Sequence, residues 1–282
     1  MTSPDQAKPS IDDVRAFWNS NPLWTGEAQA EPGSAEFFRT HNEASLAMTG
    51  GVAPEGNFPN IPVDQPLLDL GCGIGFWVEQ FWSRGYRNIT GADLSSQSLA
   101  LAQKRCDLLG ATVTLDVQNA EAMTYPDNTF AHVNCIGVIH HSPSPEKSVA
   151  EIARVLRPGG TATISVYYWN VALRAWPLVR TLARTAASVG ITLKGRGRES
   201  MMDVTSAREL IRLYDGDENP IGYSYSKPEF RDMLAPHFDV TRLYGHVFPA
   251  RILPFQIPRP VFRLAEMACP FMICANVVKR PA

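Results

Sequence analysis

Three kinds of residue in this chain could do chemistry: carboxylates at the ends of apolar runs, a glycine-rich turn and a pair of histidines. Asp69 precedes the turn Gly71-Cys72-Gly73-Ile74-Gly75, and Asp93 ends the next apolar run. Glycines let the backbone pass close to a ligand, because no Cβ stands in the way. A carboxylate at a strand end about 20 residues beyond such a turn can accept both hydroxyls of a ribose. These residues predict a site for a nucleoside-bearing ligand.

The histidines His140 and His141 end another apolar run, residues 131–141. Histidine titrates near physiological pH and is a common general acid or base. Adjacent residues on an extended strand point in opposite directions, so we expect one of them to face a substrate and favour His141. Packing against a cofactor or orienting a water is the alternative role. The pair has no third ligand at a recognisable spacing, so the sequence predicts no metal site.

The position of Phe76 decides between two kinds of cofactor. A dinucleotide fingerprint has a third glycine there, which admits a pyrophosphate. The bulky ring argues against a nicotinamide dehydrogenase. The run Leu68-Asp69-Leu70-Gly71-Cys72-Gly73-Ile74-Gly75 instead resembles motif I of the class I S-adenosylmethionine-dependent methyltransferases. A glycine-rich strand-to-helix turn without a cofactor is the alternative for this motif taken alone.

Further landmarks follow in the order that is typical of this family. Asn119-Ala120 stands where family members usually have Asp-Ala, and the amide oxygen of Asn119 can replace a carboxylate oxygen as an acceptor. The loop 125–130 and the turn Leu156-Arg157-Pro158-Gly159-Gly160 also resemble the family. The resemblance covers about residues 67–166, and the ordered set is more specific than any one landmark.

The resemblance implies S-adenosyl-L-methionine as the cofactor and distributes its contacts along the chain. The implied cofactor-binding residues are Asp69, Gly71, Cys72 and Gly73 at the methionine portion, Asp93 at the ribose, Asn119, Ala120 and Glu121 at the adenine, Leu94 with Met123 or Ile136 beside the ring, and Trp18 in a lid. His141 is the catalytic candidate, if the acceptor must lose a proton. We expect no metal.

The alternation of strand and helix patterns predicts a Rossmann-like, doubly wound α/β fold. We expect a seven-stranded, mostly parallel sheet whose last strand, residues 272–279, is inserted antiparallel between the fifth and sixth. The predicted parts are an N-terminal tail and helical lid (1–60), a cofactor-binding core (61–168), a helical substrate cover (169–225) and a C-terminal completion of the sheet (226–282). In the lid, aromatic residues near Trp18 would exclude water; packing on the domain edge is the alternative.

The cover and the C-terminal part carry more specific expectations. We predict a helix over residues 171–189 with a kink at Pro177, a basic loop at 194–198, and capping boxes that start helices at Ser206 and Ser226. The basic residues either meet an anionic acceptor or form a solvated surface. The apolar connection 247–270 is compatible with packing on the core, a dimer contact or a lipid-like substrate.

Bulk properties limit the partners and the location. A formal net charge of -2 argues against nucleic acid as substrate. The five cysteines include no C-x-x-C pair, which is typical of reduced thiols in a cytoplasmic protein. The sequence shows no leader peptide and no apolar run of membrane-spanning length. We therefore expect a cytoplasmic monomer or homodimer, with membrane association left open.

We interpret the chain as a methyltransferase that acts on a small organic acceptor, either anionic or apolar. Two alternatives remain beside it. Carbon methylation of a quinone-like lipid at a membrane surface would suit the apolar connection, and the core most resembles ubiquinone and menaquinone methyltransferases. A non-catalytic module that binds the cofactor and assembles with a partner would show affinity without turnover.

Overall fold

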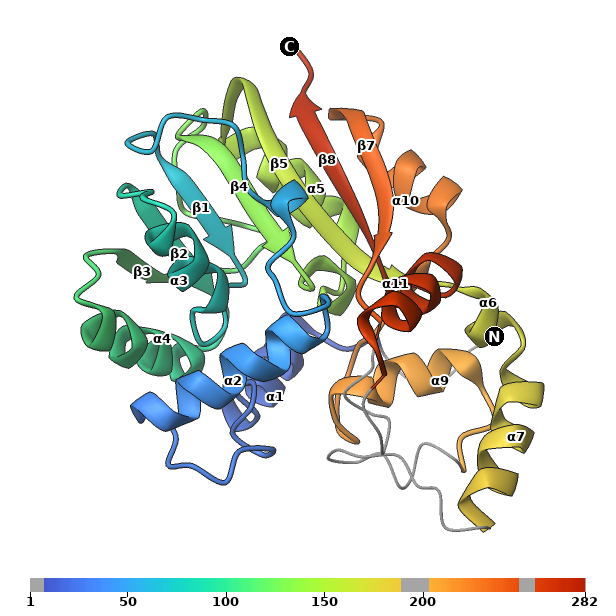
Figure 1. Cartoon of the computed structure of the whole chain (residues 1–282). Helices are drawn as coiled ribbons and strands as arrows, with labels where there is room; N and C mark the ends of the chain where they lie inside the picture. The colour runs from blue at the N-terminus through green and yellow to red at the C-terminus, as the bar shows by residue number, and fades with distance from the viewer. Residues whose placement is uncertain (1–7, 189–202, 249–256, 282) are drawn as a thin grey trace.

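The structure is a computed structural model that describes residues 8–188, 203–248 and 257–281. One twisted sheet runs through the molecule, with helices on both faces (Figure 1). Its strands are β1 (Leu67–Leu70), β2 (Ile89–Asp93), β3 (Thr114–Val117), β4 (Phe130–Ile136), β5 (Leu156–Tyr168), β6 (Ser224–Tyr225), β7 (Phe238–His246) and β8 (Met272–Lys279). The strand order is β3-β2-β1-β4-β5-β8-β7, and β6 pairs with the end of β5.

Strands β1 to β6 pair in parallel, whereas β8 runs antiparallel to both β5 and β7. The predicted Rossmann-like fold and the antiparallel insertion of the last strand are confirmed. The sheet has eight strands rather than seven, because the two-residue β6 adds a pair beside Tyr167 and Tyr168. The reversal of strand order between β1 and β4 opens the crevice in which such sheets bind ligands.

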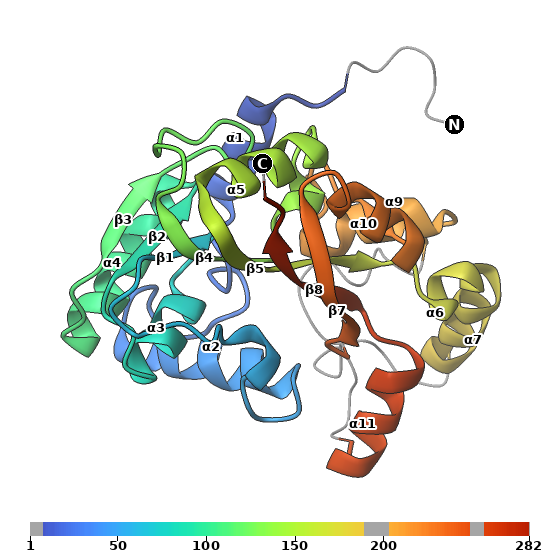
Figure 2. The same cartoon turned by 90° about the horizontal axis from the view of Figure 1, so that it is seen from above.

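Helices pack on both faces, as Figure 2 shows for α3 and α4 on one side and α5 and α10 on the other. The α-helices are α1 (Ile11–Ser20), α2 (Ala35–Ala47), α3 (Phe76–Ser83), α4 (Ser96–Leu109), α5 (Pro145–Val155), α6 (Val171–Arg174), α7 (Trp176–Ser188), α9 (Ala207–Arg212), α10 (Lys227–Leu234) and α11 (Arg259–Ala268). Short 3-10 turns are η1 (Glu55–Asn57), η2 (Ile139–His141) and η3 (Leu213–Asp215).

Local sequence explains where several helices begin. Ser10 and Asp13 form a capping box at α1, and Ser95 caps α4 by accepting a hydrogen bond from the N–H of Ser98. The predicted capping box of Ser226 and Glu229 starts α10. The box predicted at Ser206 is wrong: its hydroxyl makes no capping bond, and the carboxylate of Glu209 pairs with Arg212.

Apolar side chains on both faces of the sheet form the core. The largest cluster joins β4, β5 and β8 to α5 and α10, and it includes Val133, Ile164 and Phe230, none of which is exposed. A second cluster lies under α6, α7 and α9 and includes Trp176 and Tyr214. The core therefore extends beneath the insertion after β5, so that insertion is part of the folded body.

Three other local expectations need correction. Strand β4 ends at Ile136 and not at His141, because Gly137 has a positive φ of 80° and the chain then turns into η2. The predicted helix 171–189 is two helices, since the chain breaks at Ala175 before Pro177. Helix α11, within the connection 247–270, was not predicted. The basic loop 194–198 and Val189 lie outside the described residues.

The described residues contain neither a membrane-spanning helix nor a cluster of metal ligands. No helix in residues 8–188, 203–248 and 257–281 is long and apolar enough to cross a membrane. Over the same ranges, no three His, Cys, Asp or Glu side chains are grouped so that they could hold a metal ion. The five cysteines are free thiols.

Candidate functional site

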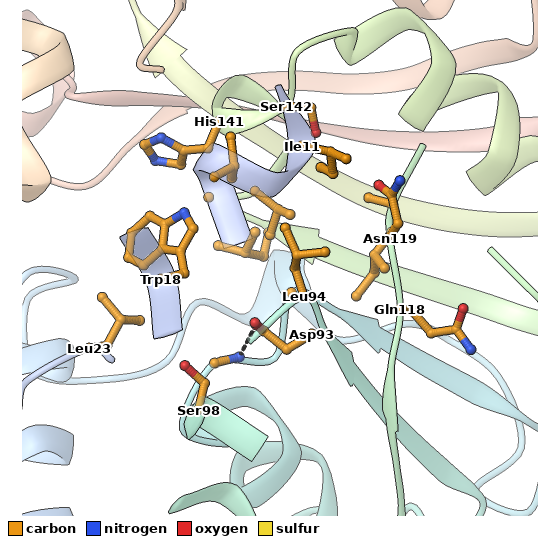
Figure 3. Close-up of a pocket in the computed structure, with 18 residues that line it drawn as sticks. Ile11, Trp18, Leu23, Asp93, Leu94, Ser98, Gln118, Asn119, His141 and Ser142 are labelled. Atoms are coloured by element: carbon orange, nitrogen blue, oxygen red, sulfur yellow. Dashed lines mark hydrogen bonds between the residues drawn. The ribbon is translucent and has the colours of Figure 1, made fainter. Parts of the chain in front are cut away.

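A cavity opens at the carboxyl ends of β1, β2 and β4, beneath α1 (Figure 3). The lining comes from the N-terminal segment (Ile11, Val14, Trp18, Leu23), from β1, β2 and the chain after each (Leu70, Gly71, Gly73, Asp93, Leu94, Ser98), from the chain after β3 (Gln118, Asn119, Ala120) and from β4 and the chain after it (Ile136, Gly137, Val138, His141, Ser142).

The glycine turn forms the floor of this cavity. Gly71 and Gly73 have φ of 72° and 53°, in the left-handed region that favours glycine. A Cβ on Gly71 would lie 2.2 Å from Cγ2 of Val138, so the turn and the chain after β4 are in close contact. The N–H groups of Gly71 and Cys72 both donate to the carbonyl of Ala92, at 2.6 and 2.9 Å. The turn is thus held by backbone bonds to β2.

Asp93 stands at the tip of β2 and points into the cavity (Figure 3). Its Oδ2 accepts the N–H of Gly73 at 2.8 Å, and its Oδ1 accepts the N–H of Ser95 at 2.8 Å. Burial raises the pKa of this carboxyl, whereas the backbone bonds lower it. Each oxygen keeps a lone pair for a ligand hydroxyl, so Asp93 can both fix the glycine turn and bind a ribose.

Asp69 behaves differently, because its side chain is 2% exposed and is not part of the cavity lining. Its Oδ1 accepts a hydrogen bond from Nδ2 of Asn134 at 2.7 Å. Its Oδ2 has no hydrogen-bond partner in the described part of the chain. Burial raises its pKa to about 7; the Asn134 bond opposes that rise and the charge of Asp93 adds to it. An acceptor oxygen is therefore left unsatisfied directly beneath the turn.

The loop after β3 is shaped by its own side chains. Gln118 exchanges two bonds with Thr124, donating to the hydroxyl at 2.8 Å and accepting the N–H at 3.0 Å. The Oδ1 of Asn119 accepts the N–H of Glu121 at 3.0 Å, which leaves its second lone pair for a ligand. Glu121 is turned away from the cavity and accepts the N–H of Ser144 at 2.7 Å. Asn119 and Ala120 line the cavity, whereas Glu121 lies outside the lining and joins this loop to Ser144.

His141 lines the cavity from η2, not from a strand. The assumption that His140 and His141 point in opposite directions on extended backbone is wrong, since both lie in a 3-10 turn with their ring centroids 4.3 Å apart. His140 is fully buried and packs on Tyr167, with ring centroids 3.9 Å apart. His141 lines the cavity and His140 does not, and the role of His141 toward a substrate stays a prediction.

Both ring nitrogens of His141 already face protein oxygens. Nδ1 lies 2.7 Å from the carbonyl oxygen of Ile221, so it must carry a proton and donate. Nε2 lies 3.3 Å from Oδ2 of Asp215, which also accepts the hydroxyl of Tyr167 at 2.5 Å. The histidine can act as a base only in the form whose Nε2 carries no proton, with Nε2 facing an acceptor in place of Asp215.

The structure thus separates the sequence candidates into two groups. The predicted residues that line the cavity are Trp18, Gly71, Gly73, Asp93, Leu94, Asn119, Ala120, Ile136 and His141. Asp69, Cys72 and Glu121 lie behind the lining, and Met123 is buried in the core cluster. Sequence reasoning missed Asp215, Ser98 and Ser142; only the aspartate-rich turn after residue 214 marked the first of them.

These residues fit an adenosyl cofactor. The turn offers glycine backbone where a Cβ would not fit, Asp93 offers acceptors for two hydroxyls, and the buried oxygen of Asp69 lacks a donor. Trp18 adds an aromatic face, which attracts a cation such as a sulfonium. Fold and site together define a nucleoside-cofactor-binding protein of the Rossmann-like class.

Comparisons with known proteins place the chain within that class. Residues 68–164 match the family described as methyltransferase domain. The chain is 26% identical over 181 residues to a ubiquinone biosynthesis O-methyltransferase of Pectobacterium atrosepticum, covering 62% of this chain and 71% of that one. It is 32% identical over 111 residues to phosphoethanolamine N-methyltransferase 2 of Caenorhabditis elegans, covering 39% of this chain and only 25% of that protein's length.

A solved structure shows the same fold over most of the chain. The S-adenosylmethionine-dependent methyltransferase structure from Methanosarcina mazei superposes with a TM-score of 0.56 at 17% identity, over 79% of this chain and 95% of that one. Residues 68–164 therefore form a methyltransferase domain, and the fold of the chain is that of S-adenosylmethionine-dependent methyltransferases. The recognition of motif I at residues 68–75 is therefore confirmed.

Proposed function

We propose that this chain transfers the methyl group of S-adenosyl-L-methionine to a small organic acceptor, and that the reaction takes place at the inner end of the cavity beneath α1. The observation that carries the proposal is Asp93, whose carboxylate accepts the backbone N–H of Gly73 and faces the cavity. The cofactor supplies a methyl group that its sulfonium already activates. The protein contributes position and exclusion of water, which suit an in-line displacement.

We assign the cofactor contacts as follows. Asp93 accepts the ribose hydroxyls, Leu94 and Ile136 flank the adenine, and Asn119 and Ala120 contact its polar edge. Gly71 and Gly73 cradle the methionine portion, with Cys72 and Glu121 as supports of the turn and the loop. Asp69 acts from below the turn: a cationic amino group above it favours the ionised carboxylate that burial otherwise disfavours.

The N-terminal segment serves as a lid in this proposal. Helix α1 brings Ile11, Val14 and Trp18 over the cavity, and the hydroxyl of Ser95 donates to the carbonyl of Trp18 at 3.1 Å. Helix α2 is held more firmly, because the buried Arg105 lies 3.1 Å from Nδ1 of His41 and 3.4 Å from a carboxylate oxygen of Glu79. Cofactor entry therefore requires α1 to move, while α2 stays attached to α3 and α4.

The acceptor lies near His141 and Ser142, where described parts of the insertion, residues 169–188 and 203–225, lie beyond the carboxyl end of β5. His141 positions the acceptor and takes its proton through Nε2 where a proton must leave, while Asp215 holds the ring in place until then. Replacing His141 with Gln should lower turnover by about 10- to 100-fold. Cofactor affinity should stay within about threefold, because the ring lies at one end of the cavity.

The four segments 1–60, 61–168, 169–225 and 226–282 correspond to lid, cofactor core, acceptor cover and sheet completion in this proposal. A lipid-like acceptor is the second candidate for the substrate. It is favoured by the exposed apolar residues of α11 and by the ubiquinone-biosynthesis relative, which is named as an O-methyltransferase. Methylation at carbon, oxygen or nitrogen is compatible with the same core.

Incubation of the protein with methyl-labelled cofactor and fractionated cell extract tests the proposal. We expect a labelled small molecule, identified by mass spectrometry, that disappears with Asp93→Ala. Calorimetry with S-adenosylmethionine and its demethylated product provides the binding control. Binding without a labelled product in any fraction would support the non-catalytic module, and absence of binding to both compounds would refute the site itself.

A further inference from the structure

Helix α11 carries apolar side chains on the side that faces solvent. Phe262 packs inward and is 4% exposed, but Val261, Leu264 and Met267 are exposed by 50%, 62% and 72%. Spacings of three residues place these three on one face of the helix. Figure 2 shows α11 extending away from the sheet, so this face lies outside the core. An apolar helix face in this position is characteristic of an interaction surface.

The charges beside this face have one sign. Arg259 and Arg263 are exposed. Glu266 faces the body of the protein, where its Oε1 accepts the N–H of Val247 at 3.0 Å and lies 3.0 Å from Nδ1 of His246. The outward charges of α11 are therefore positive, although the whole chain has a formal net charge of -2.

Helices α6 and α7 repeat this combination. Val171, Leu178 and Leu182 are exposed by 60%, 62% and 62%, and the two helices contain arginines but no acidic residue. Figure 1 places α7, α9 and α11 at the end of the molecule where α1 and α2 also lie, beyond the carboxyl ends of the parallel strands. The cavity opens at the same end. Both α7 and α11 therefore lie on the side of the molecule where the cavity opens.

Three occupants could cover such helices: another copy of the chain, a partner protein or a lipid surface. A two-fold symmetric dimer would bring α11 against α11 and oppose the arginines of one copy to those of the other. Exposed apolar side chains on helices flanked by arginine are suited to an anionic bilayer surface, where the apolar groups enter the acyl boundary and the cations meet phosphates. Charge complementarity thus favours the lipid surface.

We propose that α11 is a membrane-surface helix that binds anionic lipid reversibly and does not span the bilayer. The inference goes beyond methyl transfer and does not depend on it. Gly50 and Gly51, in the chain that follows α2, pack against Phe262 and Arg259 of α11, so the surface is in direct contact with the lid segment.

Vesicle flotation tests this proposal with the full chain. We expect the protein to float with vesicles of mixed phosphatidylcholine and phosphatidylglycerol, and not with vesicles of phosphatidylcholine alone. The bound fraction should fall as salt is raised, because salt screens the arginine contacts. The double variant Leu264→Asp/Met267→Asp should lower the bound fraction by about tenfold. Arg259→Glu/Arg263→Glu should lower it by a similar factor.

Matched controls keep the test specific to this face. Leu108→Asp changes a residue of α4 that is 58% exposed, and Lys147→Glu reverses an exposed charge on α5; neither should alter flotation. Circular dichroism and cofactor calorimetry verify that each variant is folded. Failure of the wild-type protein to float with either vesicle would overturn the proposal. Equal flotation of the Leu264→Asp/Met267→Asp variant, or a wild-type dimer that this variant dissociates, would do the same.

Discussion

The two ends of the crevice are built in different ways. At the proposed cofactor end, N–H groups of the glycine turn donate to the backbone carbonyl of Ala92 and to the side-chain carboxylate of Asp93, both in the neighbouring strand β2. At the proposed acceptor end, His141 is held by Ile221 and Asp215, which lie about 80 residues away in the insertion. The first arrangement needs few side chains, whereas the second depends on particular ones.

The match to the methyltransferase-domain family covers residues 68–164, which include the glycine turn and Asp93 and end before Tyr167 and the insertion. Backbone N–H groups are present whatever the side chains, whereas the bond from Tyr167 to Asp215 needs those two side chains. Cofactor recognition should therefore be robust to changes in the cover, and acceptor recognition should not.

The largest expected effect on cofactor binding comes from removing the carboxylate of Asp93. Asp93→Ala should weaken binding of S-adenosylmethionine and its demethylated product by at least about 100-fold, because charge-assisted bonds to the ligand and to the turn are lost together. Calorimetry measures the loss. Asp107→Ala, an exposed position on α4, is the matched control and should bind normally. Tight binding by Asp93→Ala would contradict the assignment of the ribose contact.

The glycine turn allows a test of backbone shape at the same end. Gly71→Ala should lower the free energy of unfolding by about 3 kcal/mol, since the added methyl meets Val138 at 2.2 Å and the φ of 72° is strained. Gly110→Ala shares a positive φ of 62° but has no neighbour within 4 Å, so it should cost only about 1 kcal/mol. Urea titration of both variants checks the difference. Equal costs would show that the contact with Val138 is unimportant.

The buried Asp69 provides a prediction about pH. Its folded pKa of about 7 lies above the unfolded value of about 3.9, so the folded state binds the proton more tightly. Its contribution to stability is complete below about pH 4 and is lost as pH rises toward 7. The wild-type protein should therefore lose stability relative to Asp69→Asn across this window, by at most about 1.4 kcal/mol per pH unit.

Comparison of the two proteins isolates Asp69 from the buried histidines. The pKa of His132 is lowered to about 3 by burial, which gives a pH dependence of opposite sign in both proteins alike. Urea midpoints across the window give the difference. A difference that does not vary with pH would show that Asp69 is ionised throughout. With cofactor present the difference should shrink, because a cationic amino group favours the ionised carboxylate.

The smallest expected effect on the free energy of unfolding is at the start of two helices outside the cofactor core. Ser226→Ala should lower the free energy of unfolding by about 1 kcal/mol, because that serine caps α10 in a two-way capping box. Ser206→Ala should change it by less than about 0.5 kcal/mol, since its hydroxyl makes no capping bond at α9. Thermal melts of both variants measure this. A larger loss at Ser206 would show that the insertion is held more tightly than its contacts indicate.

The sequence predicted much of the cofactor end because its determinants are local. Spacing between Gly73 and Asp93 follows from the length of one strand-helix-strand unit, and parallel strands bring their carboxyl ends to one edge. The position of β8 was also predictable from the resemblance and is confirmed. The turn that places His141 was missed, because a glycine such as Gly137 ends a strand only when its surroundings require a positive φ.

By itself, the sequence determined the fold, the glycine turn and the carboxylate at the tip of β2, because strand patterns and short spacings act between neighbours in the chain. Only the tertiary structure decided that Asp69 turns to Asn134, that His141 faces Asp215, and that α11 presents apolar residues to solvent. Each of these depends on groups far apart in sequence, whose approach is set by packing of whole helices and strands. The spacing of residues along the chain does not predict that packing.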